Sequence, residues 1–258
     1  MPITFQGNPV PSDVVTRTNG DPRYISPYFW NVVPTNAGWT SASVGTGTAL
    51  GQTPLVLSLQ SSNTSGAFGS IVSYINQTSQ TQFRLGTGTG VGGYGTLNFG
   101  NTLYFFMRMG SIFNFSNTRT DWIFTVGSQA KNVALSALLP LSATSIGYCA
   151  LECLSGNLRI VNLAAGVSPV SATRGEVIDT WANSQNHKSY MVEVRRGTVT
   201  VYNGFNGAVL GSLSGAPTNA DLTPQANSFI AFGAQSNAQG VTVPDVINIY
   251  NFAMGFVP

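Results

Sequence analysis

The stretch that decides the fold is residues 187–204, which read HKSYMVEVRRGTVTVYNG. Apolar side chains recur at every second position, at 190, 192 and 194 before the hairpin glycine and at 199 and 201 after it. A period of two describes a strand with one buried and one solvated face, as in antiparallel sheets. Gly197 directly after Arg196 predicts a tight hairpin between two such strands, and Asn203-Gly204 predicts the next turn.

Similar short runs fill the chain from about residue 37 to its end, separated by clusters of Gly, Asn and Ser. Strands are expected at residues 55–59, 70–75, 102–108, 121–126, 146–153, 158–163, 189–195, 198–202, 208–212, 228–232 and 246–252. Residues 174–181 are expected to form one short helix. About ten short strands at this spacing are typical of an all-β domain, either an antiparallel β-sandwich or a barrel.

The composition excludes several classes of protein. Only 8% of the 258 residues are charged, 43% are hydrophobic, and the net charge is +2. Coiled coils contain many more charged residues, and disordered chains contain fewer hydrophobic residues. Binding to nucleic-acid phosphates needs a larger positive charge than +2. Neither an apolar run of membrane-spanning length nor a secretory signal is present in the sequence. We therefore expect no nucleic-acid partner and no membrane insertion.

Residues 1–36 are expected to form an extended arm, followed by a β-sandwich domain in residues 37–258. Five of the 13 prolines fall within residues 1–30. Proline favours an extended chain and lacks the backbone N–H that pairs neighbouring strands. The aromatic residues of the arm would fill grooves on a neighbour, and its charged residues would fix the register. The expected assembly residues are Arg17, Asp21, Arg23, Tyr24, Tyr28, Phe29 and Trp30.

Cysteine and histidine are scarce, which limits metal and nucleophilic chemistry. Cys149 and Cys153 lie four apart on one expected strand, roughly 13 Å from each other and too far for a disulfide. His187 is the single histidine, in an expected exposed loop, and no Gly-x-Ser-x-Gly elbow accompanies it. Asp221 and Asp245 are isolated, which leaves a calcium site unsupported. We expect two buried free thiols, no metal site, no cofactor and no catalytic residue.

Glycoside hydrolysis requires two carboxyl groups roughly 5 to 10 Å apart. Glu152 and Glu193 stand alone on their expected strands, whereas Glu176 and Asp179 fall close together in the expected helix. A pair formed in space from these residues stays open as the alternative of a glycan hydrolase. The glycine-rich segment 85–95 has neither the lysine nor the following helix of a phosphate-binding loop. The expectation is a chain without enzyme activity.

Aromatic residues near loops are the candidates for a binding function. Sugar-binding sites stack aromatic rings against sugar faces and hydrogen-bond the hydroxyl groups through amide side chains. The candidate carbohydrate contacts are Trp39, Tyr94, Trp181, Tyr202 and Asn203. The competing interpretation of each aromatic residue is packing in the core or between subunits.

The last hundred residues resemble the end of a concanavalin A-like or laminin G-like jelly roll. The resemblance rests on the hairpin of residues 187–204, on SFIAFG at 228–233 and on INIYNF at 247–252. It implies a jelly-roll β-sandwich with a lectin-like fold. Members that bind calcium or cleave glucans carry acidic clusters that this sequence lacks, so the resemblance implies neither property here.

Part of the expected arm also resembles segments of known proteins. Residues 14–24, VVTRTNGDPRY, are similar to the Thr-Arg-x-x-Gly-Asp-x-Arg-Tyr segments near the start of bacteriophage fibre and head-decoration proteins, where they form attachment or trimerisation arms. This similarity implies a structural protein of the virion, made in the host cytoplasm, with other virion proteins as partners and a homotrimeric assembly. The alternative functions are a module that binds a host surface glycan and a self-assembling shell protein.

Overall fold

The computed structural model describes residues 4–5, 8–9, 24–25, 39–43, 49–51, 57–60, 68–76, 102–112, 120–129, 147–154, 156–163, 172–181, 187–216, 227–236 and 246–257. Within these residues the regular elements are all strands. They are β1 (Thr4–Phe5), β2 (Asn8–Pro9), β3 (Tyr24–Ile25), β4 (Trp39–Ser43), β5 (Ala49–Gly51), β6 (Leu57–Gln60), β7 (Phe68–Asn76), β8 (Thr102–Ile112), β9 (Thr120–Gln129), β10 (Gly147–Leu154), β11 (Asn157–Leu163), β12 (Thr173–Thr180), β13 (Lys188–Arg195), β14 (Thr198–Asn203), β15 (Val209–Ser214), β16 (Asn227–Ser236) and β17 (Val246–Val257). A helix of the length and apolarity needed to cross a membrane does not occur in these ranges.

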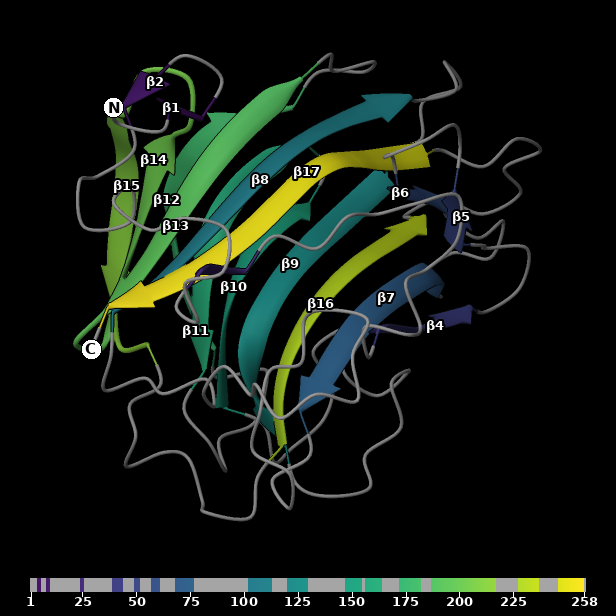
Figure 1. Ribbon diagram of the computed structural model, residues 1–258, viewed down its shortest axis with the longest axis horizontal. Helices are drawn as coiled ribbons and strands as arrows, with labels where there is room; N and C mark the ends of the chain where they lie inside the picture. Colours follow the sequence, from purple (N-terminus) through teal and green to yellow (C-terminus); the bar gives the residue numbers. More distant parts are fainter. Residues whose placement is uncertain are drawn as a thin grey trace.

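Two large antiparallel sheets stack face to face, as the long curved strands of Figure 1 show. Among the described strands, seven form one sheet in the order β12-β11-β10-β9-β16-β7-β4. Eight form the other sheet: seven in the order β15-β14-β13-β8-β17-β6-β5, and β3, which pairs with β17 off this path. Each sheet ends in its own edge strands, so the domain is a sandwich rather than a closed barrel. The predicted all-β, antiparallel sandwich is confirmed.

The hairpin between β13 and β14 forms where the sequence predicts it. Arg196 has a φ of 47° and Gly197 a φ of 73°. Positive φ at both central residues characterises the two-residue turn whose twist matches that of the flanking strands. The Arg196 backbone is the strained member of the pair, because only glycine adopts this region freely.

Alternate residues of the long strands fill the space between the sheets. On β8 the buried core positions are 103, 105, 107 and 109. Phe124 of β9 contacts rings from both sheets, with centroids 5.5 Å from Phe105, 4.9 Å from Phe232 and 5.9 Å from Phe252. These separations lie in the usual range of aromatic pairs. Aromatic packing thus holds the two sheets together at the centre of the sandwich.

The prediction of a helix over residues 174–181 is wrong, because Thr173–Thr180 forms β12 and pairs antiparallel with β11. The pairing shifts register on both sides of Arg159, which indicates irregularities at this sheet edge. Such shifts interrupt the alternation of buried and exposed side chains. The segment therefore lacks the period of two that identifies a strand in sequence.

The outermost strands β12 and β15 lie against each other and close one side of the sandwich. Asn162 of β11 donates through Nδ2 to the carbonyl oxygens of Leu213 and Ser214, at 3.2 and 3.0 Å. Gly211 of β15 lies so near β12 that a Cβ at position 211 would be 2.4 Å from Cγ2 of Ile178. The close approach of the two edges therefore requires glycine at position 211.

One segment of the expected arm adds to the sandwich. Tyr24 lies opposite Gly255 and Ile25 opposite Met254, so β3 extends the pairing of β17, the yellow C-terminal strand in Figure 1. β1 and β2 form a separate two-stranded sheet. The boundary between residues 36 and 37 stays a prediction. The other expected assembly residues, Arg17, Asp21, Arg23, Tyr28, Phe29 and Trp30, lie outside the described residues.

Replacing Gly211 with alanine should lower the free energy of unfolding by about 1–3 kcal/mol, because the added methyl overlaps Ile178 in a packed interface. Denaturant titration followed by circular dichroism measures the loss. Gly175→Ala is the matched control, because a Cβ there would lie 3.5 Å from its nearest atom, an ordinary contact. If Gly211→Ala lowers the free energy of unfolding as much in an Ile178→Ala variant as in wild type, the explanation by overlap with Ile178 is contradicted.

Candidate functional site

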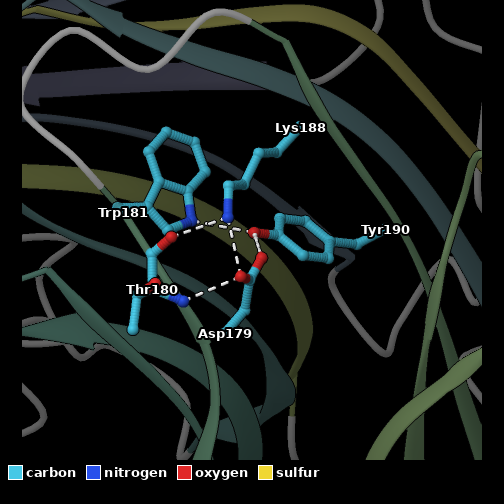
Figure 2. Close-up of polar contacts among 5 residues, drawn as sticks. All are labelled: Asp179, Thr180, Trp181, Lys188 and Tyr190. Atoms are coloured by element: carbon cyan, nitrogen blue, oxygen red, sulfur yellow. Dashed lines mark hydrogen bonds and ion pairs between the residues drawn. The ribbon is translucent and has the colours of Figure 1, made fainter.

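A dense polar cluster lies where the two sheets meet. It contains Asp179, Thr180, Trp181, Lys188 and Tyr190, and is called the Tyr190 cluster below (Figure 2). Asp179 and Thr180 end β12 of the seven-stranded sheet, whereas Lys188 and Tyr190 begin β13 of the eight-stranded sheet. The chain passes from one sheet to the other between these strands.

The Asp179 carboxylate is held from both sides, as Figure 2 shows. Lys188 Nζ donates to Asp179 Oδ1 at 2.7 Å and to the Thr180 carbonyl oxygen at 2.6 Å. The Tyr190 hydroxyl donates to Asp179 Oδ2 at 2.7 Å. The same hydroxyl accepts a hydrogen bond from Trp181 Nε1 at 2.8 Å. The phenol therefore uses both its donor and its acceptor capacity to join β12 to β13.

Burial strengthens this network, because hydrogen bonds gain strength where water is excluded. Tyr190 is 1% exposed and Trp181 5%. Burial, reinforced by the adjacent Asp179 carboxylate, raises the pKa of Tyr190 well above its usual 10. The phenol therefore stays protonated and keeps donating across the neutral and mildly alkaline range. The arrangement is suited to fixing the two sheets, since Asp179 and Tyr190 are both engaged by neighbours.

The structure places Trp181 in the core, which corrects its prediction as a sugar-stacking residue. Its backbone amide donates to the Gly156 carbonyl oxygen at 2.7 Å. Its ring packs edge-on against Trp122, with centroids 5.2 Å apart. The competing interpretation of core packing is the correct one for this tryptophan.

The candidate carboxylates of a hydrolase lie in different layers of the sandwich. Glu152 is buried on the outer face of the seven-stranded sheet, and Arg174 donates to it through Nε at 3.1 Å and Nη2 at 3.5 Å. Glu193 lies half-buried on the outer face of the eight-stranded sheet, and Asp179 lies between the sheets. Glu176 is exposed on β12. This division separates Glu152, Asp179 and Glu193 rather than bringing them to one cleft.

The predicted free thiols are confirmed. Cys149 and Cys153 are both buried and unbridged. Burial raises the pKa of Cys149 to about 12, and its Sγ donates weakly to the Val126 carbonyl oxygen. A thiol with such a pKa is unreactive at neutral pH. Across the described ranges no group of three or more His, Cys, Asp or Glu side chains is placed to hold a metal ion.

Tyr202 and Asn203 end β14 at the surface turn that leads into β15. The Asn203 side chain shapes that turn, because Oδ1 accepts from the Phe205 amide at 2.8 Å. Tyr202 is half-buried on the outer face of the eight-stranded sheet, where burial and then the charge of Glu193 raise its pKa. Phe205 adds an aromatic ring that is 36% exposed at the same turn.

The remaining predicted contacts are placed only in part. Trp39 begins β4 in the seven-stranded sheet, opposite Tyr74 of β7. Tyr94, Asp221 and Asp245 lie outside the described residues. The structure thus keeps Tyr202 and Asn203 together and puts Trp39 on the other sheet.

His187 is exposed, as expected, but it is more than a loop residue. Its backbone is left-handed, with a φ of 51°, and its ring centroid lies 4.7 Å from that of Tyr250. No local sequence pattern indicates this contact, because the two residues are far apart in the chain.

Comparison with solved structures finds the same fold in plant lectins. The lectin UEA-II in complex with galactose has a TM-score of 0.52 at 13% identity, over 91% of this chain and 99% of the lectin. The seed lectin of Lotus tetragonolobus has a TM-score of 0.52 at 11% identity, over 90% and 98%. The acidic lectin of winged bean with methyl-α-D-galactose has a TM-score of 0.52 at 10% identity, over 91% and 100%.

These matches confirm the concanavalin A-like sandwich that the C-terminal hairpins predict, and they extend it over nine-tenths of the chain. Neither a protein-family model nor a curated protein sequence matches the chain. At identities this low, the similarity defines the fold and leaves the function to be argued from the residues.

Replacing Tyr190 with phenylalanine should lower the free energy of unfolding by about 1–3 kcal/mol, since Trp181 Nε1 and Asp179 Oδ2 lose their partner. The effect should also depend on pH. Above pH 10 an unfolded tyrosine loses its proton while folded Tyr190 keeps it, so wild-type stability falls as the pH rises. The variant should lose less stability over the same range.

Denaturant titrations between pH 8 and 11 measure both effects. Tyr202→Phe is the control, because Tyr202 is a tyrosine of the same sheet that is only half-buried and lies outside the Tyr190 cluster. Equal losses in the two variants, or the same alkaline slope in Tyr190→Phe and wild type, would contradict the assigned role of the Tyr190 hydroxyl.

Proposed function

We propose that this chain is a lectin-like protein without enzyme activity that binds a carbohydrate on the host cell surface and is carried on a virus particle by its N-terminal arm. The observation that carries the binding role is a concanavalin A-like sandwich in which two of the candidate carboxylates, one buried and one partly buried, are bound by its own side chains. Glu152 is bound by Arg174, and Asp179 by Lys188 and Tyr190. These contacts stabilise the scaffold that presents the surface.

The separation of the carboxylates favours binding over hydrolysis. A glycoside hydrolase needs its acid and its nucleophile or base roughly 5 to 10 Å apart on one cleft. Glu152 and Glu193 lie on opposite outer faces, and Asp179 lies between the sheets. Tyr202, by contrast, lies half-buried on the outer face of its sheet beside the surface turn that Asn203 begins, and aromatic and amide side chains are the types used in sugar recognition.

The virion role is supported by the sequence. The similarity of residues 14–24 to fibre and decoration-protein arms and the proline-rich arm both favour it. Free, buried cysteines are typical of proteins made in a reducing compartment. In this proposal the arm holds three copies together and binds the other virion proteins, and the sandwich faces outward as a capsid decoration or fibre.

A glycan array probed with the full chain tests the binding role. Wild type should bind a defined subset of glycans, and at least one of Trp39→Ala, Tyr94→Ala and Tyr202→Ala should lose about tenfold or more in affinity, the scale of a lost aromatic contact in a binding hot spot. Val177→Ala, which truncates an exposed apolar residue on the edge strand β12, should bind as wild type. Failure to bind any glycan would overturn the proposal.

The arm is tested by light scattering after size exclusion. The full chain should have a native mass near three times 27.2 kDa. The combined replacement of Tyr28, Phe29 and Trp30 by alanine should release single chains, because these rings would fill the grooves between copies. A single-chain mass for wild type would contradict the trimeric assembly.

A further inference from the structure

The outer face of the eight-stranded sheet is open to solvent where β13, β14 and β15 lie side by side (Figure 1). Alternate residues of β13 and β14 fill the core, so the residues between them point outward. On β15, Ser212 and Ser214 are exposed and lie opposite the outward threonines of β14. The outward side chains of this region, with the hairpin residue beside them, are called the Arg195 face below. They are Arg195, Arg196, Thr198, Thr200, Ser212 and Ser214.

Arg195 and Arg196 concentrate positive charge at the β13–β14 hairpin. No other two of the 11 basic residues are adjacent in the sequence. Both arginines are exposed, and within the described part of the chain neither guanidinium makes a hydrogen bond or an ion pair. Glu193, the acidic residue of β13, is two residues from Arg195, roughly 7 Å along the strand. Two cations and one carboxylate leave this face positively charged.

The backbone of Arg196 is unfavourable for an arginine. Its φ of 47° lies in the left-handed region, where asparagine or glycine is the usual choice in a two-residue hairpin turn. Packing does not explain the arginine, because its side chain is exposed. Strained residues of this kind gather at functional sites. The strain therefore indicates that the guanidinium of Arg196 serves a contact outside the chain.

Hydroxyl groups lie beside the two arginines. Thr198 is opposite Arg195, and Ser214 is opposite Thr198 on the next strand. Thr200 and Ser212 repeat this pairing two residues farther along, roughly 7 Å away. Among the described residues, the side chains of these threonines and serines have no hydrogen-bond partner. Each hydroxyl can both donate and accept, whereas the guanidinium groups only donate.

This chemistry fits a sugar that carries a negative group better than it fits a protein. The centre of a protein interface is rich in aromatic and apolar side chains and poor in serine. The Arg195 face contains only arginine, threonine and serine. Guanidinium forks pair with carboxylate or phosphate oxygens, and side-chain hydroxyls exchange hydrogen bonds with sugar hydroxyls. The combination is therefore matched to an anionic glycan.

Tyr202 continues the same surface along β14. It lies four residues from Thr198, roughly 14 Å along the strand. Burial and then the charge of Glu193 raise the pKa of Tyr202, and the charge of Arg195 opposes this rise. The three side chains thus share one electrostatic environment. The length from the arginines to the tyrosine ring suits a short oligosaccharide.

We propose that the Arg195 face binds an anionic glycan, in which Arg195 and Arg196 pair with the negative group and the threonine and serine hydroxyls bind the sugar. This inference rests on the proposed function, because it names the class of glycan that the lectin-like sandwich recognises. The negative group lies at the β13–β14 hairpin, and the sugar chain extends from there along β14 toward Tyr202.

The test uses the full chain and pairs of oligosaccharides that differ only in the negative group. The probes are trigalacturonate with its methyl ester, and mannotriose with and without a terminal phosphate. Wild type should bind at least one anionic probe about tenfold or more tightly than its neutral partner, and this preference should weaken as salt is raised. The preferred pair distinguishes a carboxylate from a phosphate. A hexaglutamate peptide serves as the probe for an acidic protein partner.

Arg196→Asn separates binding from stability. Asparagine tolerates the left-handed backbone, so the melting temperature should stay the same or rise, while the preference for the anionic glycan falls about tenfold. Arg195→Gln should reduce the same preference. Arg159→Gln is the matched control, because it removes the same charge from β11 on the outer face of the other sheet, and it should bind as wild type. A lower melting temperature with unchanged binding in Arg196→Asn would show that Arg196 serves only the turn.

The outcomes separate this inference from the function on which it rests. Equal binding of anionic and neutral glycans, tighter binding of hexaglutamate than of every glycan, or a preference unchanged in both Arg195→Gln and Arg196→Asn would overturn the anionic site. The proposed glycan binding would still stand as long as any glycan is bound. Failure to bind every anionic and neutral glycan would overturn both.

Discussion

The hydrogen-bonded phenol of Tyr190 ties the two sheets of this protein together. Its hydroxyl joins Asp179, near the end of β12 in one sheet, to β13 in the other, and it also accepts a hydrogen bond from the buried Trp181. Because the group is buried, each of these polar atoms would be costly to leave unpaired. The placement of the start of β13 against the end of β12 therefore depends on this contact.

Residues at the start of β13 point alternately into the sandwich and toward its outer face. Lys188 and Tyr190 point inward to the Tyr190 cluster, whereas His187 and the outer face of the same strand approach Arg108 and Tyr250. The period of two thus sends neighbouring residues of this strand to opposite faces of the sheet. On the inner face, Lys188 and Tyr190 bind the Asp179 carboxylate and hold the two sheets together.

Local pattern explains which features could be predicted. The hairpin at Gly197 and most strands can be predicted from alternating apolar residues and turn residues. β12 could not be predicted as a strand, because its irregular pairing with β11 breaks the alternation. The position of Trp181 beside a polar stretch predicts a surface residue, but its hydrogen bond to Tyr190, nine residues away, accompanies its burial in the core. Contacts such as His187 with Tyr250 depend on strand order, which no local pattern encodes.

Saturation-transfer NMR with a time course on one sample tests the central claim, that this lectin-like sandwich binds glycans without cleaving them. The protein is mixed with intact oligosaccharides, acidic and neutral, and the sugar signals are followed over hours. The account predicts saturation transfer to a subset of glycans whose reducing-end signals stay constant. Growth of new reducing-end signals would show hydrolysis, and absence of transfer to every glycan would show that the fold is used for something else; either result would contradict the account.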